Sequence, residues 1–326
     1  MMTENVSNLR EHALPLGESR RGALFPNLLI VGAAKGGTTA LHYALDQHPD
    51  VYMSKKKEPG YFVWPEENLQ FINNGELITQ PRFLVNHLDD YLKLFEDGKN
   101  KKIRGESSTT YLFFYQKAVY NIKKIHPDPA NVNVVIMLRN PVDRAFSQYM
   151  HKLRDGAESL SFEEALEKEQ WREENNWHFD YQYTKRGFYY EQVKTFLENF
   201  PLTKIFLFED LKNETEKVLN DLQQFLGLEL KVLDAGDELN VSGKPKVESV
   251  NRFLKKKNPI KEFVGKLLPK DLRRRLRLKV QSTVYKYNLE KETMNPETRE
   301  KLQGVFHDDV MKLQELIGRD LTAWIS

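Results

Sequence analysis

Residues 28–39 contain the groups best suited to bind a phosphate. Four apolar residues lead into a glycine-rich turn with one lysine and two threonines, and an amphipathic stretch follows. This pattern predicts a strand, a loop and a helix. The unpaired N–H groups and the positive dipole end of such a helix favour an anion. The same glycines also suit an ordinary strand-to-helix turn. The candidate binding positions are Lys35, Gly36, Gly37, Thr38 and Thr39.

The lysine of this loop does not stand where nucleoside triphosphatases have theirs. Gly32 and Gly37 have the G-x-x-x-x-G spacing, but Thr38 occupies the position that requires lysine in that motif. Lys35 lies inside the loop instead. We therefore expect the loop to hold the 5′-phosphate of a nucleotide, with Lys35 beside the group that leaves from that phosphate or departs with it.

A second set of anion-binding side chains follows an apolar run that is typical of a central strand. Arg139 comes directly after this run, and Asn140 and Pro141 are a favourable N-cap and first residue of a helix. Arg139 should therefore lie at the carboxyl end of a parallel strand, where open α/β sheets bind ligands. Ser147 lies about two helical turns later and can face the same side. Alternatively, Arg139 pairs with Asp143 and Ser147 lies on the helix surface.

Glu58 is a candidate general base. It stands beside three lysines, and Tyr61 and Phe62 follow it. The two aromatic side chains must bury and would pull Glu58 toward the core side of its loop. A carboxylate held among cations can accept a proton, whereas a solvated loop is the alternative. The hydroxyl-rich residues 107–110 follow a predicted strand and can serve as a helix cap or as ligand donors.

Two cationic stretches follow residue 240. The first is a loop in which Gly243, Lys244 and Lys246 either bind a ligand or lie on a plain surface. The second, residues 251–280, has twelve Lys or Arg against two acidic residues, and its apolar residues recur every four positions. This spacing predicts a basic amphipathic helix, within a helical insertion at about residues 251–290. It either packs on the protein's own core or recruits an acidic glycan, an acidic carrier protein or an anionic membrane surface.

Strand and helix patterns alternate along the chain. Apolar runs near residues 28–31, 51–53, 132–138 and 204–208 predict strands, residues 102–106 resemble a further strand, and amphipathic stretches between the strands predict helices. This alternation is typical of an α/β fold, a central parallel sheet with helices on both faces. Residues 1–24 form an expected flexible tail before a single domain at 25–326. Residues 64–88 are predicted to be irregular, as a possible flap, and the aromatic segment 171–183 to be an acceptor-site wall or a packed excursion.

Composition narrows the class of protein. The chain of 326 residues is 40% hydrophobic, which is ample for a buried core, and its 49 basic and 47 acidic residues nearly balance. The overall charge therefore indicates no nucleic-acid partner. The absence of cysteine excludes disulfides and thiolate catalysis, and suits a reducing compartment. The N-terminus lacks the apolar core of a signal peptide, and the chain has no run of about 18 apolar residues. We expect a cytoplasmic enzyme without a transmembrane segment.

Taken together, these motifs resemble the sulfotransferases that use 3′-phosphoadenosine 5′-phosphosulfate (PAPS), in particular the bacterial and heparan-sulfate-type branch. The resemblance extends from about Asn27 to Trp324. The matching motifs are residues 35–41, residues 57–62, Arg139-Asn140-Pro141 through Ser147, Gly187-Phe188-Tyr189, Phe225-Leu226-Gly227-Leu228 and the closing Leu-Ile-Gly-x-x-Leu-x-x-Trp. The resemblance implies a P-loop-like domain.

The resemblance also implies a role for each candidate residue. Lys35, Gly36, Gly37, Thr38 and Thr39 would hold the 5′-phosphosulfate, and Arg139 and Ser147 the 3′-phosphate. The loop with Gly243, Lys244 and Lys246 would close over the nucleotide, and Glu58 would act as the base. The product nucleotide would be adenosine 3′,5′-bisphosphate (PAP), and no metal is expected. His48, His87 and His178 are possible second bases.

The acceptor and two other classes of function stay open. The acceptor hydroxyl or amine could belong to a glycan, to an acyl chain on a carrier protein or to a small natural product. A P-loop nucleotide kinase or triphosphatase would share the sheet and the loop but should need magnesium. A catalytically inactive module would bind the nucleotide without turnover.

Overall fold

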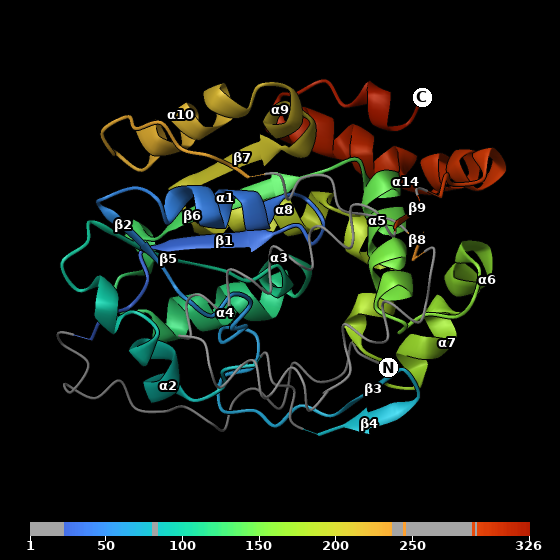
Figure 1. Cartoon of the computed structure of the whole chain (residues 1–326), viewed down its shortest axis with the longest axis horizontal. Helices are drawn as coiled ribbons and strands as arrows, with labels where there is room; N and C mark the ends of the chain where they lie inside the picture. The colour runs from blue at the N-terminus through green and yellow to red at the C-terminus, as the bar shows by residue number, and fades with distance from the viewer. Residues whose placement is uncertain (1–22, 80–83, 237–243, 246–288, 291) are drawn as a thin grey trace.

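Five parallel strands form the centre of the fold (Figure 1). The structure is a computed structural model that describes residues 23–79, 84–236, 244–245, 289–290 and 292–326. Their order is β2-β5-β1-β6-β7. All of these strands were predicted from the sequence, and the prediction of a parallel sheet is confirmed. The bounds are β1 (Leu28–Gly32), β2 (Val51–Met53), β5 (Ile103–Ser107), β6 (Asn133–Leu138) and β7 (Thr203–Leu207).

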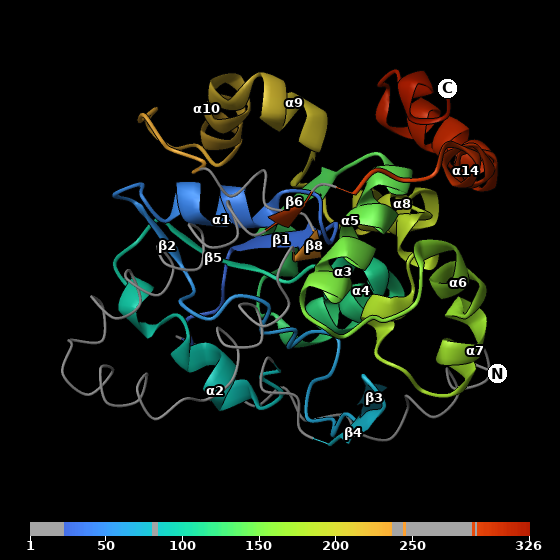
Figure 2. The same ribbon diagram turned by 45° about the vertical axis from the view of Figure 1, so that its right-hand side comes forward.

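Helices cover both faces of the sheet because neighbouring strand residues point to opposite sides. In β1, Leu28 and Ile30 pack in one apolar cluster with α1 and α10, whereas Leu29 and Val31 pack in another with α4, α5 and α8. Figures 1 and 2 show these two helical layers above and below the sheet. The described helices are α1 (Thr38–Leu45), α2 (Leu88–Lys93), α3 (Thr110–Phe113), α4 (Tyr115–Ile125), α5 (Pro141–Arg154), α6 (Phe162–Glu167), α7 (Glu169–Glu174), α8 (Tyr190–Asn199), α9 (Phe208–Asn213), α10 (Thr215–Phe225) and α14 (Pro296–Ile317). Short 3-10 turns lie at η3 (Glu96–Gly98), η4 (Pro129–Asn131), η5 (Phe179–Tyr181), η6 (Lys185–Gly187) and η8 (Thr322–Trp324).

A β-hairpin lies inside the stretch that was predicted to be irregular. Strands β3 (Phe71–Asn73) and β4 (Glu76–Ile78) pair in antiparallel fashion. Asn74 and Gly75 between them both have positive φ, 52° and 76°, as a two-residue hairpin turn requires. The sequence prediction treated these residues as irregular, and it missed the hairpin because each strand has only three residues.

The C-terminal helix α14 packs against α5 and α8. Asn295 caps α14, since its side chain accepts a hydrogen bond from the backbone N–H of Glu297 at 2.9 Å. Gly318 ends the helix in the left-handed conformation, with φ 64°. Trp324 is buried beyond it, and its carbonyl accepts a hydrogen bond from the side-chain amide of Asn140 at 3.3 Å. The chain end thereby fastens the start of α5.

Several predictions concern residues outside the described part of the chain. They are most of the tail 1–24, Gly243, Lys246 and almost all of the basic helical insertion at 251–290. Within the described residues, no helix combines the length and the apolarity that a bilayer crossing requires.

Candidate active site

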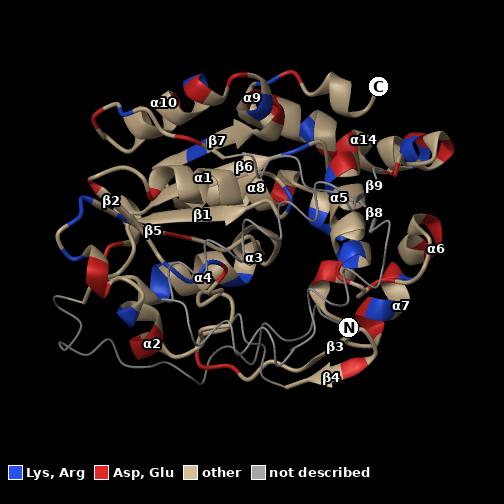
Figure 3. Ribbon diagram, viewed as in Figure 1, with Lys and Arg blue, Asp and Glu red and all other residues tan. Residues whose placement is uncertain are grey.

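One cavity of about 410 Å³ gathers most of the predicted site residues at the carboxyl ends of the sheet strands. Its lining comes from segments that are far apart in the sequence: the loop after β1, the loop before β3, the β5–α3 turn, α5 and the segment around η5. Figure 3 shows basic positions along α5, beside this end of the sheet. The predicted site residues on the lining are Lys35, Gly37, Thr38, Thr39, Glu58, Arg139 and Ser147.

The loop between β1 and α1 is tightly packed against the strand that follows. A Cβ atom on Gly36 would lie 2.5 Å from the carbonyl oxygen of Met137, so only glycine fits there. Gly37 has φ 96° and supplies no side-chain cap to α1. The first N–H groups of α1 therefore have neither an intrahelical partner nor a side-chain cap from the N-cap position. These N–H groups lie where the sequence predicts a phosphate to bind.

Lys35 lies on the cavity wall in a strained backbone conformation, with φ 67°. Burial lowers the pKa of its ammonium group to about 8, and the positive charges of Arg154 and Arg139 act in the same direction. Asp155 and Asp180 oppose this shift. An anion bound in the cavity would act in the opposite direction on this pKa, because a nearby negative charge favours the charged form of the ammonium group.

Arg139 is held between α9 and the loop that joins β1 to α1, which is called the phosphate loop below because a phosphate is its expected ligand. Its guanidinium NH1 donates to the carbonyl oxygen of Lys35 at 3.2 Å, and its Cζ lies over the ring of Phe208, 4.6 Å from the ring centroid. Asp143 forms its ion pair with Arg299 instead, at 2.6 Å. The alternative in which Asp143 neutralises Arg139 is therefore wrong. Asn140 caps α5 through Val142 N–H at 2.9 Å, as predicted.

Two buried hydroxyl groups on the cavity wall have no hydrogen-bond partner among the described residues. They are Ser147 Oγ, on a side chain that is 4% exposed, and Thr110 Oγ1, on one that is 7% exposed. Buried hydroxyls are normally paired. Both are therefore available to a ligand, and Ser147 and Arg139 line the same cavity.

Glu58 lies beside the β5–α3 turn, and hydrogen bonds hold its carboxylate there. Its Oε1 accepts from Lys57 Nζ at 2.7 Å, and its Oε2 accepts from the backbone N–H and the hydroxyl of Thr109 at 2.7 and 3.1 Å. Tyr61 and Phe62 are wholly buried, as predicted, and they anchor this loop in the core. The side chain of Glu58 is 31% exposed, so its carboxylate reaches the cavity.

The histidines divide between the cavity and the rest of the fold. His178 lines the cavity, and burial lowers its pKa to about 4. His48 and His87 do not: they contact the carbonyl of Glu229 and the carboxylate of Glu66. His151, which the prediction missed, also lines the cavity, and burial together with the charge of Lys35 lowers its pKa to about 3. It follows Ser147 by four residues on one helix, a spacing from which it could have been found.

The wall opposite the phosphate loop comes from the aromatic segment. Its cavity-lining residues include Phe179 and Asp180, whereas Tyr181 and Tyr183 are packed in the core. Asp180 accepts from Arg186 at 2.5 Å and lies 3.5 Å from Lys152 Nζ, and these cations hold the pKa of its carboxyl well below the usual range. Sequence patterns did not predict this pairing.

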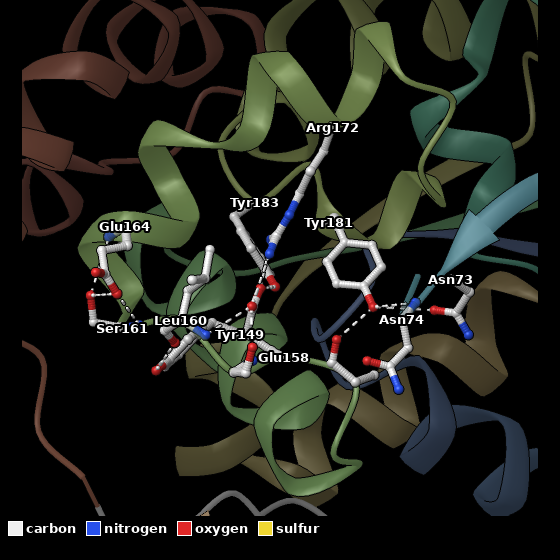
Figure 4. Close-up of polar contacts among 12 residues, drawn as sticks. Asn73, Asn74, Tyr149, Glu158, Leu160, Ser161, Glu164, Arg172, Tyr181 and Tyr183 are labelled. Carbon is white, nitrogen blue, oxygen red and sulfur yellow. Dashed lines mark hydrogen bonds and ion pairs between the residues drawn. The ribbon is translucent and has the colours of Figure 1, made fainter. Parts of the chain in front are cut away.

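A buried polar network braces that wall (Figure 4). Glu158 accepts two hydrogen bonds from the guanidinium of Arg172, at 2.6 and 2.9 Å, and one from the hydroxyl of Tyr183 at 2.9 Å. Tyr181 donates to the carbonyl of Ala157 at 2.6 Å, and its hydroxyl accepts from Asn74 N–H of the β3–β4 hairpin at 3.3 Å. The hairpin is thereby joined to Tyr181, and α7 is joined to Tyr183 through Glu158, just after the cavity-lining residues 178–180.

The predicted closing loop is described at two residues. Strand β8 (Lys244–Pro245) pairs in antiparallel fashion with β9 (Leu289–Glu290), and β8 lies beside α5 (Figure 2). Gly243 and Lys246 lie outside the described residues.

The chain is similar to known proteins over most of its length. The model of the sulfotransferase domain family matches residues 25–316. A solved sulfotransferase from Alicyclobacillus acidocaldarius is 31% identical, with a TM-score of 0.69, and covers 93% of this chain and 100% of that one. The match supports the predicted P-loop-like α/β fold over nearly the whole chain.

Two curated relatives match over shorter spans. The membrane-associated sulfotransferase kil1 of Dictyostelium discoideum is 31% identical over 124 residues, which are 38% of this chain and 22% of that protein. The heparan sulfate glucosamine 3-O-sulfotransferase 6 of Mus musculus is 30% identical over 234 residues, 69% of this chain and 59% of that protein. The chain thus spans less than two thirds of the length of these relatives. Because the family match covers most of its length, the chain belongs to the sulfotransferase domain family.

Proposed function

We propose that this protein transfers the sulfuryl group of PAPS to a hydroxyl or amine of an acceptor and releases PAP. The observation that carries the proposal is one cavity that is lined by two separate cationic groups and a carboxylate. One anion site is the loop with Lys35 at the start of α1, and the other is Arg139 with the unpartnered hydroxyl of Ser147. Two separate anion sites suit a nucleotide with phosphates at two positions.

The residues fit the donor nucleotide. Gly36, Gly37, Thr38 and Thr39 would bind the 5′-phosphate through the N–H groups at the start of α1, where the close packing of Gly36 leaves no room for a side chain. Arg139 and Ser147 would bind the 3′-phosphate. Gly243, Lys244 and Lys246 would close over the nucleotide, a role supported by the position of β8 beside α5.

The chain's own groups suit an in-line displacement. Glu58 takes the proton of the acceptor while the acceptor oxygen or nitrogen forms its bond to sulfur. The bond between sulfur and the bridging oxygen breaks, and negative charge builds on that oxygen. Lys35 and the loop N–H groups stabilise this charge, as donors do in an oxyanion hole. His151 and His178 are neutral at physiological pH, since burial lowers both pKa values to about 3 and 4.

The acceptor can be a glycan, a carrier-bound acyl chain or a small natural product. The name of the mouse relative supports a glycan. The basic segment 251–280 would recruit an acidic glycan or an acidic carrier protein. The cysteine-free composition supports a cytoplasmic location.

Calorimetry with PAP in the presence of a metal chelator tests the proposal. We expect tight binding of PAP, with adenosine 5′-phosphate and ATP binding more weakly, because neither has a 3′-phosphate for Arg139 and Ser147. Tight ATP binding that requires magnesium would instead favour a nucleotide kinase. Tight PAP binding without transfer of labelled sulfate from PAPS to any acceptor or to water would identify an inactive binding module.

A further inference from the structure

A buried carboxylate lies behind the cavity wall at the end of β5. The side chain of Glu106 is 0% exposed, and three hydroxyl groups donate to it. Its Oε1 accepts from Tyr91 at 3.0 Å and from Tyr111 at 2.5 Å, and its Oε2 accepts from Ser108 at 2.7 Å. A buried charge is expensive unless it is paired, so this arrangement calls for a reason.

Two of these hydroxyls also hold the loop that carries Glu58. Ser108 Oγ accepts from the backbone N–H of Gly60 at 3.0 Å, and Tyr111 OH accepts from the backbone N–H of Phe62 at 3.4 Å. Each hydroxyl therefore donates to Glu106 and accepts from the Glu58 loop. Tyr91 differs, because its hydroxyl donates to Glu106 at 3.0 Å and no described contact joins that hydroxyl to the loop.

The loop needs such support because Glu58 has an unfavourable backbone. Its φ is 60°, in the left-handed region that non-glycine residues rarely adopt. The end of β5 holds it there: Glu58 N–H donates to the carbonyl of Ser107 at 2.9 Å, and Thr109 donates to its carboxylate. Glu106 orients the hydroxyl protons of Ser108 and Tyr111 so that their lone pairs face the loop N–H groups.

We propose that Glu106 is a positioning residue that fixes the carboxylate of Glu58 toward the acceptor, acting through Ser108, Tyr111 and the backbone of residues 60–62. The inference rests on the proposed role of Glu58 as the base. Glu158 offers a contrast within the same molecule, because this buried carboxylate pairs with Arg172 and contacts no part of the Glu58 loop in the described contacts.

A double-mutant cycle between Glu58 and Glu106 tests the proposal. The assay is sulfuryl transfer from PAPS to water, which needs no knowledge of the acceptor: a water oxygen forms its bond to sulfur, PAP leaves, and a proton goes to Glu58. We expect Glu58→Gln to lower the turnover number by ~10²-fold or more. Glu106→Gln should lower it by ~10-fold, with PAP affinity unchanged, and should have no further effect in the Glu58→Gln background.

Two matched variants separate positioning from general destabilisation. Ser108→Ala removes a hydroxyl that reaches the loop and should resemble Glu106→Gln, whereas Tyr91→Phe should retain most of the turnover. Hydrogen exchange of residues 60–62 should accelerate in Glu106→Gln and Ser108→Ala. It should not accelerate in Val310→Ala, which truncates a buried residue of α14 remote from this cluster.

The outcomes distinguish the two proposals. Wild-type turnover of Glu58→Gln would overturn the base role and the positioning role with it. A strong effect of Glu58→Gln combined with an independent, multiplicative effect of Glu106→Gln would overturn the positioning role alone. Equal losses of turnover and PAP affinity in Glu106→Gln would also overturn it, because they would indicate a structural role.

Discussion

The two sides of the cavity differ in how their cations are neutralised. On the opposite wall, Arg186 and Lys152 lie 2.5 and 3.5 Å from the carboxylate of Asp180, and Lys57 lies 2.7 Å from Glu58. On the phosphate-loop side, neither Lys35 nor Arg139 forms an ion pair with a carboxylate among the described residues.

This difference separates binding from proton transfer. A cation without an anionic partner is ready to bind a phosphate, whereas a cation that is already paired mainly fixes the geometry of its carboxylate. The phosphate-loop side thus suits a polyanionic nucleotide, and the opposite side suits the acceptor and the base. Substitutions on the phosphate-loop side should therefore change the binding of the nucleotide or the stabilisation of its leaving oxygen, whereas substitutions on the opposite side should change proton transfer from the acceptor.

The largest expected effect comes from Lys35. In Lys35→Ala we expect turnover of PAPS to fall by about 10²-fold or more with a modest loss of PAP affinity, because the lysine stabilises charge that develops during transfer. Turnover is measured as PAP release, and affinity by calorimetry. Lys93→Ala, an exposed lysine paired with Asp90 on α2, is the control. Near-wild-type turnover of Lys35→Ala would contradict the proposed difference between the two sides of the cavity, because Lys35 would then not stabilise the leaving oxygen.

Substitution of Arg139 tests whether the second anion site binds the 3′-phosphate. In Arg139→Ala the affinity for PAP should fall by roughly 10- to 100-fold, as expected for a lost charge-assisted hydrogen bond, while the affinity for adenosine 5′-phosphate should change little. Arg319→Ala, which breaks an exposed ion pair with Asp210, serves as the control. If both nucleotides lose affinity equally in Arg139→Ala, this arginine does not bind the 3′-phosphate.

The pH dependence of catalysis should report Lys35. Its ammonium group is protonated below its pKa of about 8 and becomes neutral above it. Since only the protonated form stabilises the leaving oxygen, kcat/KM should fall by ~10-fold for each pH unit above that value. Lys35→Arg should move this decline to higher pH. An unchanged alkaline limb in Lys35→Arg would assign the decline to another group.

The smallest effect concerns stability, and it involves the acceptor side. Burial raises the pKa of Glu106 from 4.5 to about 7, although its three hydroxyl partners oppose the shift. The folded protein therefore binds more protons than the unfolded chain between these values, and its free energy of unfolding should decline as the pH rises through them, by at most roughly 3 kcal/mol. Denaturant unfolding should show a flatter profile for Glu106→Gln. A profile as steep as that of the wild type would contradict the shift.

Local patterns sufficed for the phosphate-loop side. The apolar run, the glycines and the amphipathic stretch predicted β1, its loop and α1, and the Asn140-Pro141 cap predicted the start of α5. These features depend on neighbours within about two helical turns, so sequence periodicity contains them. Arg139 and Ser147 could be assigned to one cavity because the end of a strand sets the position of Arg139 and the face of the following helix sets the position of Ser147.

The acceptor side depended on contacts between distant segments. Asp180 lies beside the ammonium group of Lys152, 28 positions away on α5. Glu106 accepts a hydrogen bond from the hydroxyl of Tyr91 on α2. No periodicity records such pairings. The β3–β4 hairpin was missed for a related reason, because strands of three residues give too short an alternation, and the hairpin is held by pairing of Ile72 with the segment before His178.

A structure of the protein with PAP bound tests the central claim most directly. We expect the 5′-phosphate at the N–H groups of Gly37, Thr38 and Thr39 with Lys35 alongside, and the 3′-phosphate within hydrogen-bond distance of Arg139 and Ser147. PAP bound elsewhere, or bound here with its 3′-phosphate away from both residues, would contradict it.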